Sequence, residues 1–143
     1  MRYWDSSAIV PLLVAEPGSD LVRACLREDP HMVTWVLSRL ELAGAVERRS
    51  RQGLLDGTGR RELLDRLATL AAHADEVTEV LAVRQHALLL LARHALRAAD
   101  AAQLAAAYLA SEGNPSSLTF VCLDRALARA AELEGFAVLT WER

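Results

Sequence analysis

The sequence predicts an α/β domain of three layers, in which helices cover both faces of a central, mostly parallel sheet of four to five short strands. Two observations predict this class. Short strand-forming runs alternate with helical segments along the whole chain, which is typical of parallel strands joined by crossover helices. The strand-forming runs are also continuously apolar, as expected for strands that helices cover on both faces.

Length and composition narrow the class of protein. The chain has 143 residues, which predicts a single domain spanning 1–143 that can bury a sizeable core. Its formal net charge is −3, so binding to nucleic acid would need a local basic patch or bound cations. All sixteen basic residues are Arg. Codon bias alone can explain the absence of Lys, but this absence also counts against P-loop nucleotide hydrolases and phosphoaspartate enzymes, which use a lysine.

The cysteines and the hydropathy pattern predict a cytoplasmic protein. Cys25 and Cys122 are far apart, match no zinc-site spacing and are expected to be buried apolar residues of a reducing compartment. No apolar stretch reaches the roughly 18 residues that a membrane span needs. Asp5 interrupts the start of the chain, and the apolar run after it is short, so we expect neither a secretory signal nor membrane association.

The first strand is predicted at 2–4, and Asp5 follows it directly. Ser6 or Ser7 is expected to cap a helix over 7–16, because serine is a favoured N-cap, and a proline within this helix should kink or shorten it. In open α/β sheets, ligands bind at the carboxyl ends of the strands. Asp5 is therefore a candidate site residue, and the alternative is that it only caps the helix.

The remaining elements follow in alternation. The predicted helices cover 19–28, 38–52, 60–74, 82–94, 100–111 and 125–133. The predicted strands cover 32–35, 77–81, 118–123 and 137–140, of which 77–81 has the weakest pattern. Gly135 is expected to end the last helix. We expect helices 38–52 and 60–74 to pair as an antiparallel hairpin.

Apolar side chains at helical spacing predict the buried face of each helix. In helix 19–28 these are Leu21, Val22, Cys25 and Leu26. In the helix that starts near 38 they are Leu37, Leu40, Ala43 and Val46, and Glu41 stands beside them. In helix 60–74 they are Leu63, Leu64, Leu67 and Leu70.

Four acids share one position in this scheme, because each directly follows a strand or lies in the first turns of a helix. They are Asp5, Glu41, Asp100 and Asp124. In a parallel sheet, strand ends and the following helix starts lie at one edge, so topology alone gathers them. Gathered carboxylates repel unless a cation neutralises them, and oxygen ligands favour Mg²⁺ or Mn²⁺. Such an ion activates water and suits phosphoryl chemistry.

Each acid also has a purely structural explanation. Asp5 and Asp124 are placed to cap helices, and Asp100 would suit the dipole at a helix start. Glu41 is more informative, since an acid beside an apolar stripe needs a partner. The prediction of a metal site therefore rests on the four residues together.

Four segments carry a family resemblance. YWDSSAIVPLL, SRLELAGAV, LRAADAAQLAAA and FVCLDRALARAAELEGF resemble, in order, the four motif regions of PIN-domain ribonucleases, in particular VapC-type toxins. The resemblance covers essentially the whole chain. It implies a PIN-like fold and a Mg²⁺- or Mn²⁺-dependent endoribonuclease that cleaves RNA, is often a homodimer, and is held inactive by a cognate VapB-like antitoxin.

The resemblance also assigns roles to residues. Asp5, Glu41, Asp100 and Asp124 match the family's acidic quartet, and so are the implied catalytic and metal-binding residues. Ser6 stands where the family usually has Thr or Ser, as a supporting residue beside the first acid. Cys122 departs from the pattern, because a Thr or Ser is common at this position.

Other features stay open at this stage. An arginine cluster forms either a phosphate-binding rim or a solvated helix face, and its members are Arg48, Arg49, Arg51, Arg60 and Arg61. Trp35 is either a core residue or a base-stacking one. A groove for an antitoxin helix is expected between helices 38–52 and 60–74, near Glu41. The alternatives to a toxin nuclease are a catalytically weak binding module of the same fold and a metal-dependent phosphatase.

Overall fold

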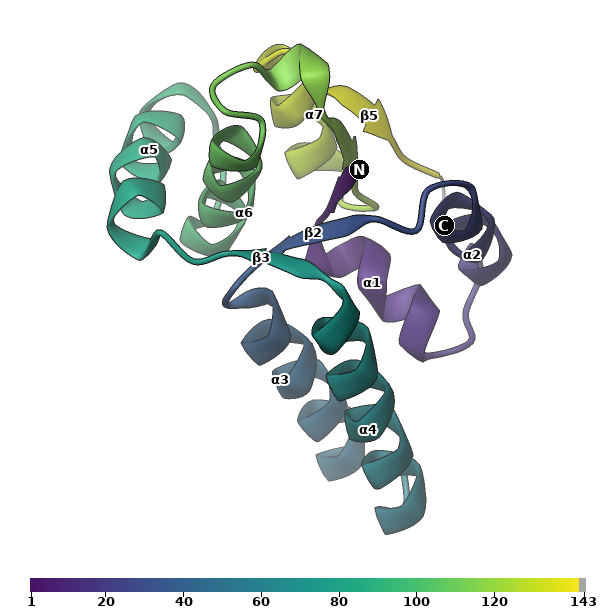
Figure 1. Ribbon diagram of the computed structural model, residues 1–143. Coiled ribbons are helices and arrows are strands. Elements are labelled where there is room, and N and C mark those ends of the chain that lie inside the picture. Colours follow the sequence, from purple (N-terminus) through teal and green to yellow (C-terminus); the bar gives the residue numbers. More distant parts are fainter. Residues whose placement is uncertain (142–143) are drawn as a thin grey trace.

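The computed structural model describes residues 1–141 (Figure 1). Its elements in chain order are β1 (Arg2–Trp4), α1 (Ser6–Leu13), α2 (Ser19–Glu28), β2 (Met32–Trp35), α3 (Ser38–Arg51), α4 (Gly57–His73), β3 (Asp75–Val77), α5 (Val80–Arg93), α6 (Ala98–Ala110), a short 3₁₀ helix (Pro115–Ser117), β4 (Thr119–Val121), α7 (Arg125–Leu133) and β5 (Ala137–Leu139). No helix in the described part of the chain is long and apolar enough to cross a membrane.

The five strands form one sheet in the order β3-β2-β1-β4-β5, and each neighbouring pair is parallel. At the centre, Tyr3 is in register with Val33 on one side and Phe120 on the other. The predicted α/β class with a parallel sheet is confirmed. Because every pair is parallel, the carboxyl ends of all five strands lie along one edge of the sheet.

Alternate side chains of the strands point into two separate cores. Tyr3 and Phe120 stack at 5.3 Å between ring centroids and belong to the core under α5, α6 and α7. Trp4 and Val121, the next residues along the same strands, belong to the core under α1, α2, α3 and α4. Figure 1 shows these two sets of helices on opposite sides of the sheet, which confirms the three layers.

The start of α1 differs from the prediction. Asp5, and not a serine, is the N-cap, with an extended backbone and a side chain that accepts a hydrogen bond from the Ser7 backbone N–H. Asp5 takes this role because the strand ends there and its carboxylate reaches the first free N–H of the helix. The helix contains Pro11 and ends at Leu13, so the predicted shortening is confirmed.

Helices α3 and α4 form the predicted hairpin, which extends away from the sheet (Figure 1). Leu42 and Val46 of α3 share a core with Leu63 and Leu67 of α4. The start of α4 is earlier than predicted. Asp56 caps it by accepting a hydrogen bond from the Gly59 backbone N–H at 2.7 Å. This cap explains how two glycines are accommodated in the first turn.

The predicted burial is wrong for three leucines. Leu21, Leu37 and Leu40 are exposed, and the Leu40 side chain is 70% exposed. In α3 the buried row is instead Ser38, Leu42 and Val46. Apolar residues occur on two adjoining faces of this helix, and packing against β2 and α4 decides which face is buried.

The third strand also lies two residues earlier than predicted, at Asp75–Val77. Asp75 and Glu76 are exposed because β3 is an edge strand with polar side chains. Its only buried residue is Val77. A pattern of apolar residues cannot locate such a strand, and α5 begins at Val80 where the strand was expected.

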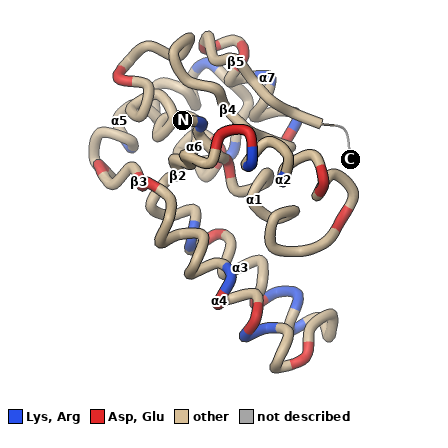
Figure 2. Tube along the Cα trace, turned by 45° about the vertical axis from the view of Figure 1, so that its right-hand side comes forward, with Lys and Arg blue, Asp and Glu red and all other residues tan. Residues whose placement is uncertain are grey.

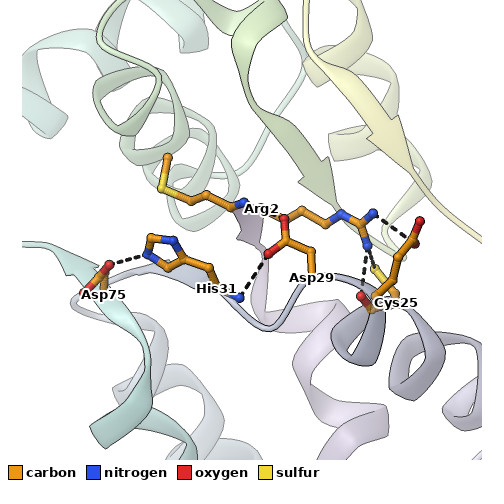
Figure 3. Close-up of polar contacts among 7 residues, drawn as sticks. Arg2, Cys25, Asp29, His31 and Asp75 are labelled. Carbon is orange, nitrogen blue, oxygen red and sulfur yellow. Dashed lines mark hydrogen bonds and ion pairs between the residues drawn. The ribbon is translucent and has the colours of Figure 1, made fainter.

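A polar network fixes the amino-terminal edge of the sheet (Figure 3). The Arg2 guanidinium donates to the Cys25 carbonyl at 2.9 Å and to Glu28 at 3.0 Å, which ties β1 to α2. His31 Nε2 lies 2.5 Å from Asp75 Oδ2 and ties β2 to β3. These contacts join two pairs of elements at the edge opposite the four acids.

Candidate active site

Asp5 lies at the carboxyl end of β1, and its side chain is 4% exposed. Its backbone N–H donates to the Val121 carbonyl at 3.0 Å, which continues the pairing with β4. Both the backbone N–H and the hydroxyl of Ser7 donate to Asp5 Oδ2, at 3.1 and 2.5 Å. Burial raises the pKa of Asp5; the Ser7 hydrogen bonds oppose this effect, and the nearby Asp100 carboxylate adds to it.

Ser7 and Cys122 form the support around Asp5. The Ser7 hydroxyl oxygen accepts a hydrogen bond from the Leu123 backbone N–H at 3.0 Å. The Cys122 thiol lies 3.6 Å from Asp5 Oδ2 as a weak donor, and its sulfur accepts from the Asp124 backbone N–H at 3.3 Å. Burial raises the pKa of the Cys122 thiol strongly, so it stays protonated. The cysteine thus keeps a donor at the position where the sequence resemblance leads us to expect a Thr or Ser hydroxyl.

Glu41 lies in the first turn of α3 and is partly buried. Gln103 Nε2 donates to Glu41 Oε1 at 3.2 Å, and the Ser6 side chain also forms a hydrogen bond with this carboxylate. Burial raises the pKa of Glu41; these two hydrogen bonds oppose the shift, and the Asp5 and Asp100 charges add to it. Ser6, predicted to support the first acid, therefore contacts Glu41.

Asp100 lies in the first turn of α6, next to Arg97, the residue that precedes this helix. Arg97 Nε donates to Asp100 Oδ2 at 3.2 Å, although the Arg97 side chain is 82% exposed. The pKa of Arg97 is raised by this hydrogen bond and by the charges of Asp100, Asp124 and Glu41. Arg97 is thus a cation that three of the four acids share.

Asp124 follows β4 and is the N-cap of α7, where its Oδ1 accepts a hydrogen bond from the Leu127 backbone N–H at 2.9 Å. The capping explanation considered from the sequence therefore holds for Asp124, as it does for Asp5. Capping uses oxygens of both residues, but the Asp5 charge still interacts with Asp100 and Glu41, and the Asp124 charge with Arg97.

The structure brings the four acids to one edge of the sheet, as the topology argument predicted. Asp5, Glu41 and Asp100 interact electrostatically with one another, and Asp124 joins them through Arg97. Within residues 1–141, however, no three His, Cys, Asp or Glu side chains are close enough to hold one ion. In this arrangement Asp100 is paired with Arg97, and Asp124 caps its helix.

The chemistry of the donor set fits a hard divalent cation. Oxygen-only donors match Mg²⁺ or Mn²⁺. Burial is the main cause of the raised pKa values of Asp5 and Glu41, and a cation would offset both the burial of these charges and the lesser contribution from neighbouring acids. Binding would require Asp100 to turn away from Arg97, and the exposure of that arginine makes this movement easy.

The sequence reasoning missed Ser7 and Gln103. Gln103 is 1% exposed and bonds to groups on β1, α1 and α3. The signal was present in the third motif, because Gln103 follows Asp100 by three residues on the same face of an otherwise apolar helix.

The structure shows where the hairpin arginines and Trp35 lie and what they contact. Arg60 forms two hydrogen bonds with Glu47, at 2.9 and 2.6 Å, and Arg49 lies 3.9 Å from Glu16. Figure 2 shows basic and acidic residues interspersed at the far end of the hairpin. Trp35 is buried in the core, so it is not available for base stacking.

The groove predicted between α3 and α4 is present only as a small pocket of about 20 Å³, lined in part by Leu42, Leu67 and Leu70. The facing side chains of the two helices otherwise share one core. An open groove lies instead between α1, α2 and α4. Its lining combines apolar and charged side chains, including Leu12, Leu26, Leu70, Arg23 and Arg66. The combination of leucines and arginines that we expected between α3 and α4 therefore lines this other groove.

The fold was compared with known proteins. It is similar to the crystal structure of FitAcB from Neisseria gonorrhoeae, with a TM-score of 0.66 and 24% sequence identity over 97% of this chain and 96% of that chain. It is also similar to the structure of FitAB bound to IR36 DNA fragment, with a TM-score of 0.62 and 23% identity over 98% of this chain and 94% of that chain. No family model and no curated protein matches the sequence. The chain therefore shares its parallel α/β fold with these structures over nearly its whole length.

Proposed function

We propose that this chain is a metal-dependent endoribonuclease that hydrolyses RNA phosphodiester bonds in the cytoplasm as the toxin of a toxin–antitoxin pair. The observation that carries the proposal is the gathering of Asp5, Glu41, Asp100 and Asp124 at the carboxyl edge of a PIN-like sheet. Buried acids that repel one another destabilise a fold, and a bound cation relieves this cost.

In this proposal Asp5, Glu41 and Asp100 hold Mg²⁺ or Mn²⁺, and Asp124 supports them from α7. The ion supplies an activated water and offsets charge on the scissile phosphate. Ser7 holds the Asp5 carboxylate in place, and Ser6 and Gln103 hold that of Glu41. Arg97, released from Asp100, is placed to pair with a phosphate oxygen of the substrate.

Two assays test the reaction class. Purified protein with Mn²⁺ should cleave RNA internally and leave p-nitrophenyl phosphate intact, whereas a phosphatase would do the opposite. Expression of the chain alone should arrest growth, and Asp100→Ala should relieve the arrest at equal protein levels. Wild-type expression that is harmless without any partner would contradict the toxin assignment.

A cognate antitoxin is part of the proposal. The groove between α1, α2 and α4 would accept the apolar face of an amphipathic segment, and Arg23 and Arg66 would pair with acids along its edge. The protein encoded next to this chain should relieve the growth arrest and co-purify with it. Leu26→Asp, on the groove wall, should abolish co-purification while leaving the toxicity of the chain intact.

A homodimer is the assembly that we propose. Helix α5 exposes large apolar side chains on its outer face, which are Val80, Leu81, Leu88, Leu89 and Leu91. Exposed apolar surface of this kind marks protein interfaces. Light scattering after gel filtration should give twice the chain mass for wild type and the chain mass for Leu81→Arg/Leu88→Arg.

One observation favours the alternative of a catalytically weak binding module with the same fold. The described acids are not arranged to hold an ion, and Asp100 is already paired with Arg97. RNA binding without cleavage in either Mg²⁺ or Mn²⁺ would establish this alternative.

A further inference from the structure

A buried amide at Gln103 connects three of the segments that carry the acids. Its Oε1 accepts a hydrogen bond from the Tyr3 hydroxyl at 2.6 Å. Its Nε2 lies 3.0 Å from Ser6 Oγ, 2.9 Å from Ser38 Oγ and 3.2 Å from Glu41 Oε1. One side chain of α6 thus contacts β1, the start of α1 and the first turn of α3.

Tyr3 fixes the orientation of this amide. The Tyr3 side chain is completely buried, and burial raises its pKa well above the ordinary value, so its hydroxyl remains protonated and donates. A donor at Oε1 forces the NH₂ end of the amide toward Ser6, Ser38 and Glu41. The reversed amide would place its oxygen against the Glu41 carboxylate, which can only accept when it is ionised.

The Gln103 amide nitrogen, Nε2, carries fewer hydrogen atoms than there are oxygens within hydrogen-bonding distance of it. An amide NH₂ has two hydrogens, and three oxygens lie within hydrogen-bonding distance. Ser6 also bonds the Glu41 carboxylate, so its hydroxyl can accept from Gln103 and donate to Glu41. Direct and relayed bonds therefore converge on one carboxylate and restrict its rotation.

The residues that make these contacts lie close in the chain to three of the four acids. Tyr3 and Ser6 flank Asp5 in the chain, Ser38 begins the helix turn that carries Glu41, and Gln103 lies one turn after Asp100. The amide therefore sets the relative placement of three elements as well as the direction of one carboxylate. A side chain that only filled space would need no polar atoms at this buried point.

We propose that Gln103 is a positioning residue that orients the Glu41 carboxylate for divalent-metal binding. This inference rests on the proposed function, because it assumes that Glu41 is a metal ligand. Partners that orient metal ligands in this way typically change metal affinity by roughly 10- to 100-fold.

The test is the Mn²⁺ affinity of the purified protein, measured by isothermal titration calorimetry. Gln103→Met keeps the length of the side chain and removes both donors, so it should weaken Mn²⁺ binding by roughly 10- to 100-fold. Leu104→Ala is the matched control, because the neighbouring Leu104 is equally buried but packs in the core under α5, α6 and α7. This control should lower the melting temperature and leave the Mn²⁺ affinity unchanged.

Tyr3→Phe provides a second and milder variant if Gln103→Met does not fold. It removes only the hydroxyl that fixes the amide and should weaken Mn²⁺ binding by about two- to tenfold, the equivalent of one neutral hydrogen bond. A folded variant of either kind with wild-type Mn²⁺ affinity overturns the role of Gln103 and leaves the nuclease proposal standing. A wild-type protein that binds no Mn²⁺ overturns both.

Discussion

Arg97 and Asp100 form an ion pair within one turn of α6, with 3.2 Å between Arg97 Nε and Asp100 Oδ2. The arginine side chain is largely exposed, whereas that of the acid is only 17% exposed. The pair therefore places an exposed cation beside Asp100, where it also interacts electrostatically with Glu41 and Asp124. A divalent ion bound by Asp100, as proposed, would compete with this guanidinium for the carboxylate.

Arg97→Ala should tighten Mn²⁺ binding, because the substitution removes the cation that competes for Asp100. The melting temperature without metal should change little, since exposed ion pairs contribute weakly to stability. Titration calorimetry measures the affinity, with Arg93→Ala as a control for loss of an arginine paired elsewhere, to Glu134. Weaker Mn²⁺ binding by Arg97→Ala would show that the arginine supports the metal site.

Asp5→Asn should keep the fold and lose metal-induced stabilisation. Asparagine is as good an N-cap as aspartate, so the hydrogen bond from the Ser7 backbone N–H survives. A ligand at 100 times its Kd stabilises a protein by about 2.7 kcal/mol, and wild type should gain a shift of this order in Mn²⁺. Thermal melts with and without Mn²⁺ measure this effect. An equal gain in Asp5→Asn would exclude Asp5 as a ligand.

The pH dependence of stability should carry the signature of the raised pKa values of Asp5 and Glu41. A raised pKa means that the folded state binds more protons than the unfolded state, so this contribution is most favourable at low pH. It is lost as pH rises from the ordinary values, 3.8 and 4.5, through the raised ones. Without metal, Asp5→Asn should therefore be more stable than wild type at pH 7, and the difference should shrink toward pH 4. A difference that does not vary with pH would contradict the assigned shift.

The two cysteines should be unreactive in the native protein. Cys25 and Cys122 are buried, and burial raises the pKa of both thiols. Since the thiolate is the reactive form, a colorimetric thiol reagent at pH 8 should label neither cysteine until denaturant is added. Labelling of Cys122→Ser and Cys25→Ser proteins would identify any cysteine that reacts early. Rapid native labelling of Cys122 would mean that the pocket beside Asp5 opens.

The sequence predicted those parts of the fold that follow from local pattern. The bounds of β1 and α2 agree with the prediction, because an acid ends the strand and proline–glycine and aspartate–proline breaks bound the helix. The buried face of α3 could not be predicted, because Leu40 and Leu42 are equally apolar and only packing against β2 and α4 separates them. The edge strand β3 has too little apolar character to be located.

The candidate site was predictable only in part, for a similar reason. Strand order and chain topology bring the four acids to one edge, and both follow from the alternation of strands and helices. The contacts that hold these acids depend on which side chain faces inward. In the structure Ser7 holds Asp5, whereas Ser6 contacts Glu41. Gln103 joins Ser6 to Glu41, and this contact could be found only once the relative positions of α6 and α3 were known.

The measurement that tests the central claim most directly is cleavage of RNA by matched variants in Mn²⁺. Glu41→Gln removes one charge from the acidic site, and Glu47→Gln removes one from the same helix, at an ion pair with Arg60 outside the site. We expect internal cleavage by wild type and Glu47→Gln that EDTA abolishes. Glu41→Gln should lose at least roughly 10- to 100-fold, because losing a ligand should cost no less than losing a partner that orients one. Equal cleavage by the two variants, or cleavage that persists in EDTA, would contradict a metal-dependent nuclease built on these four acids.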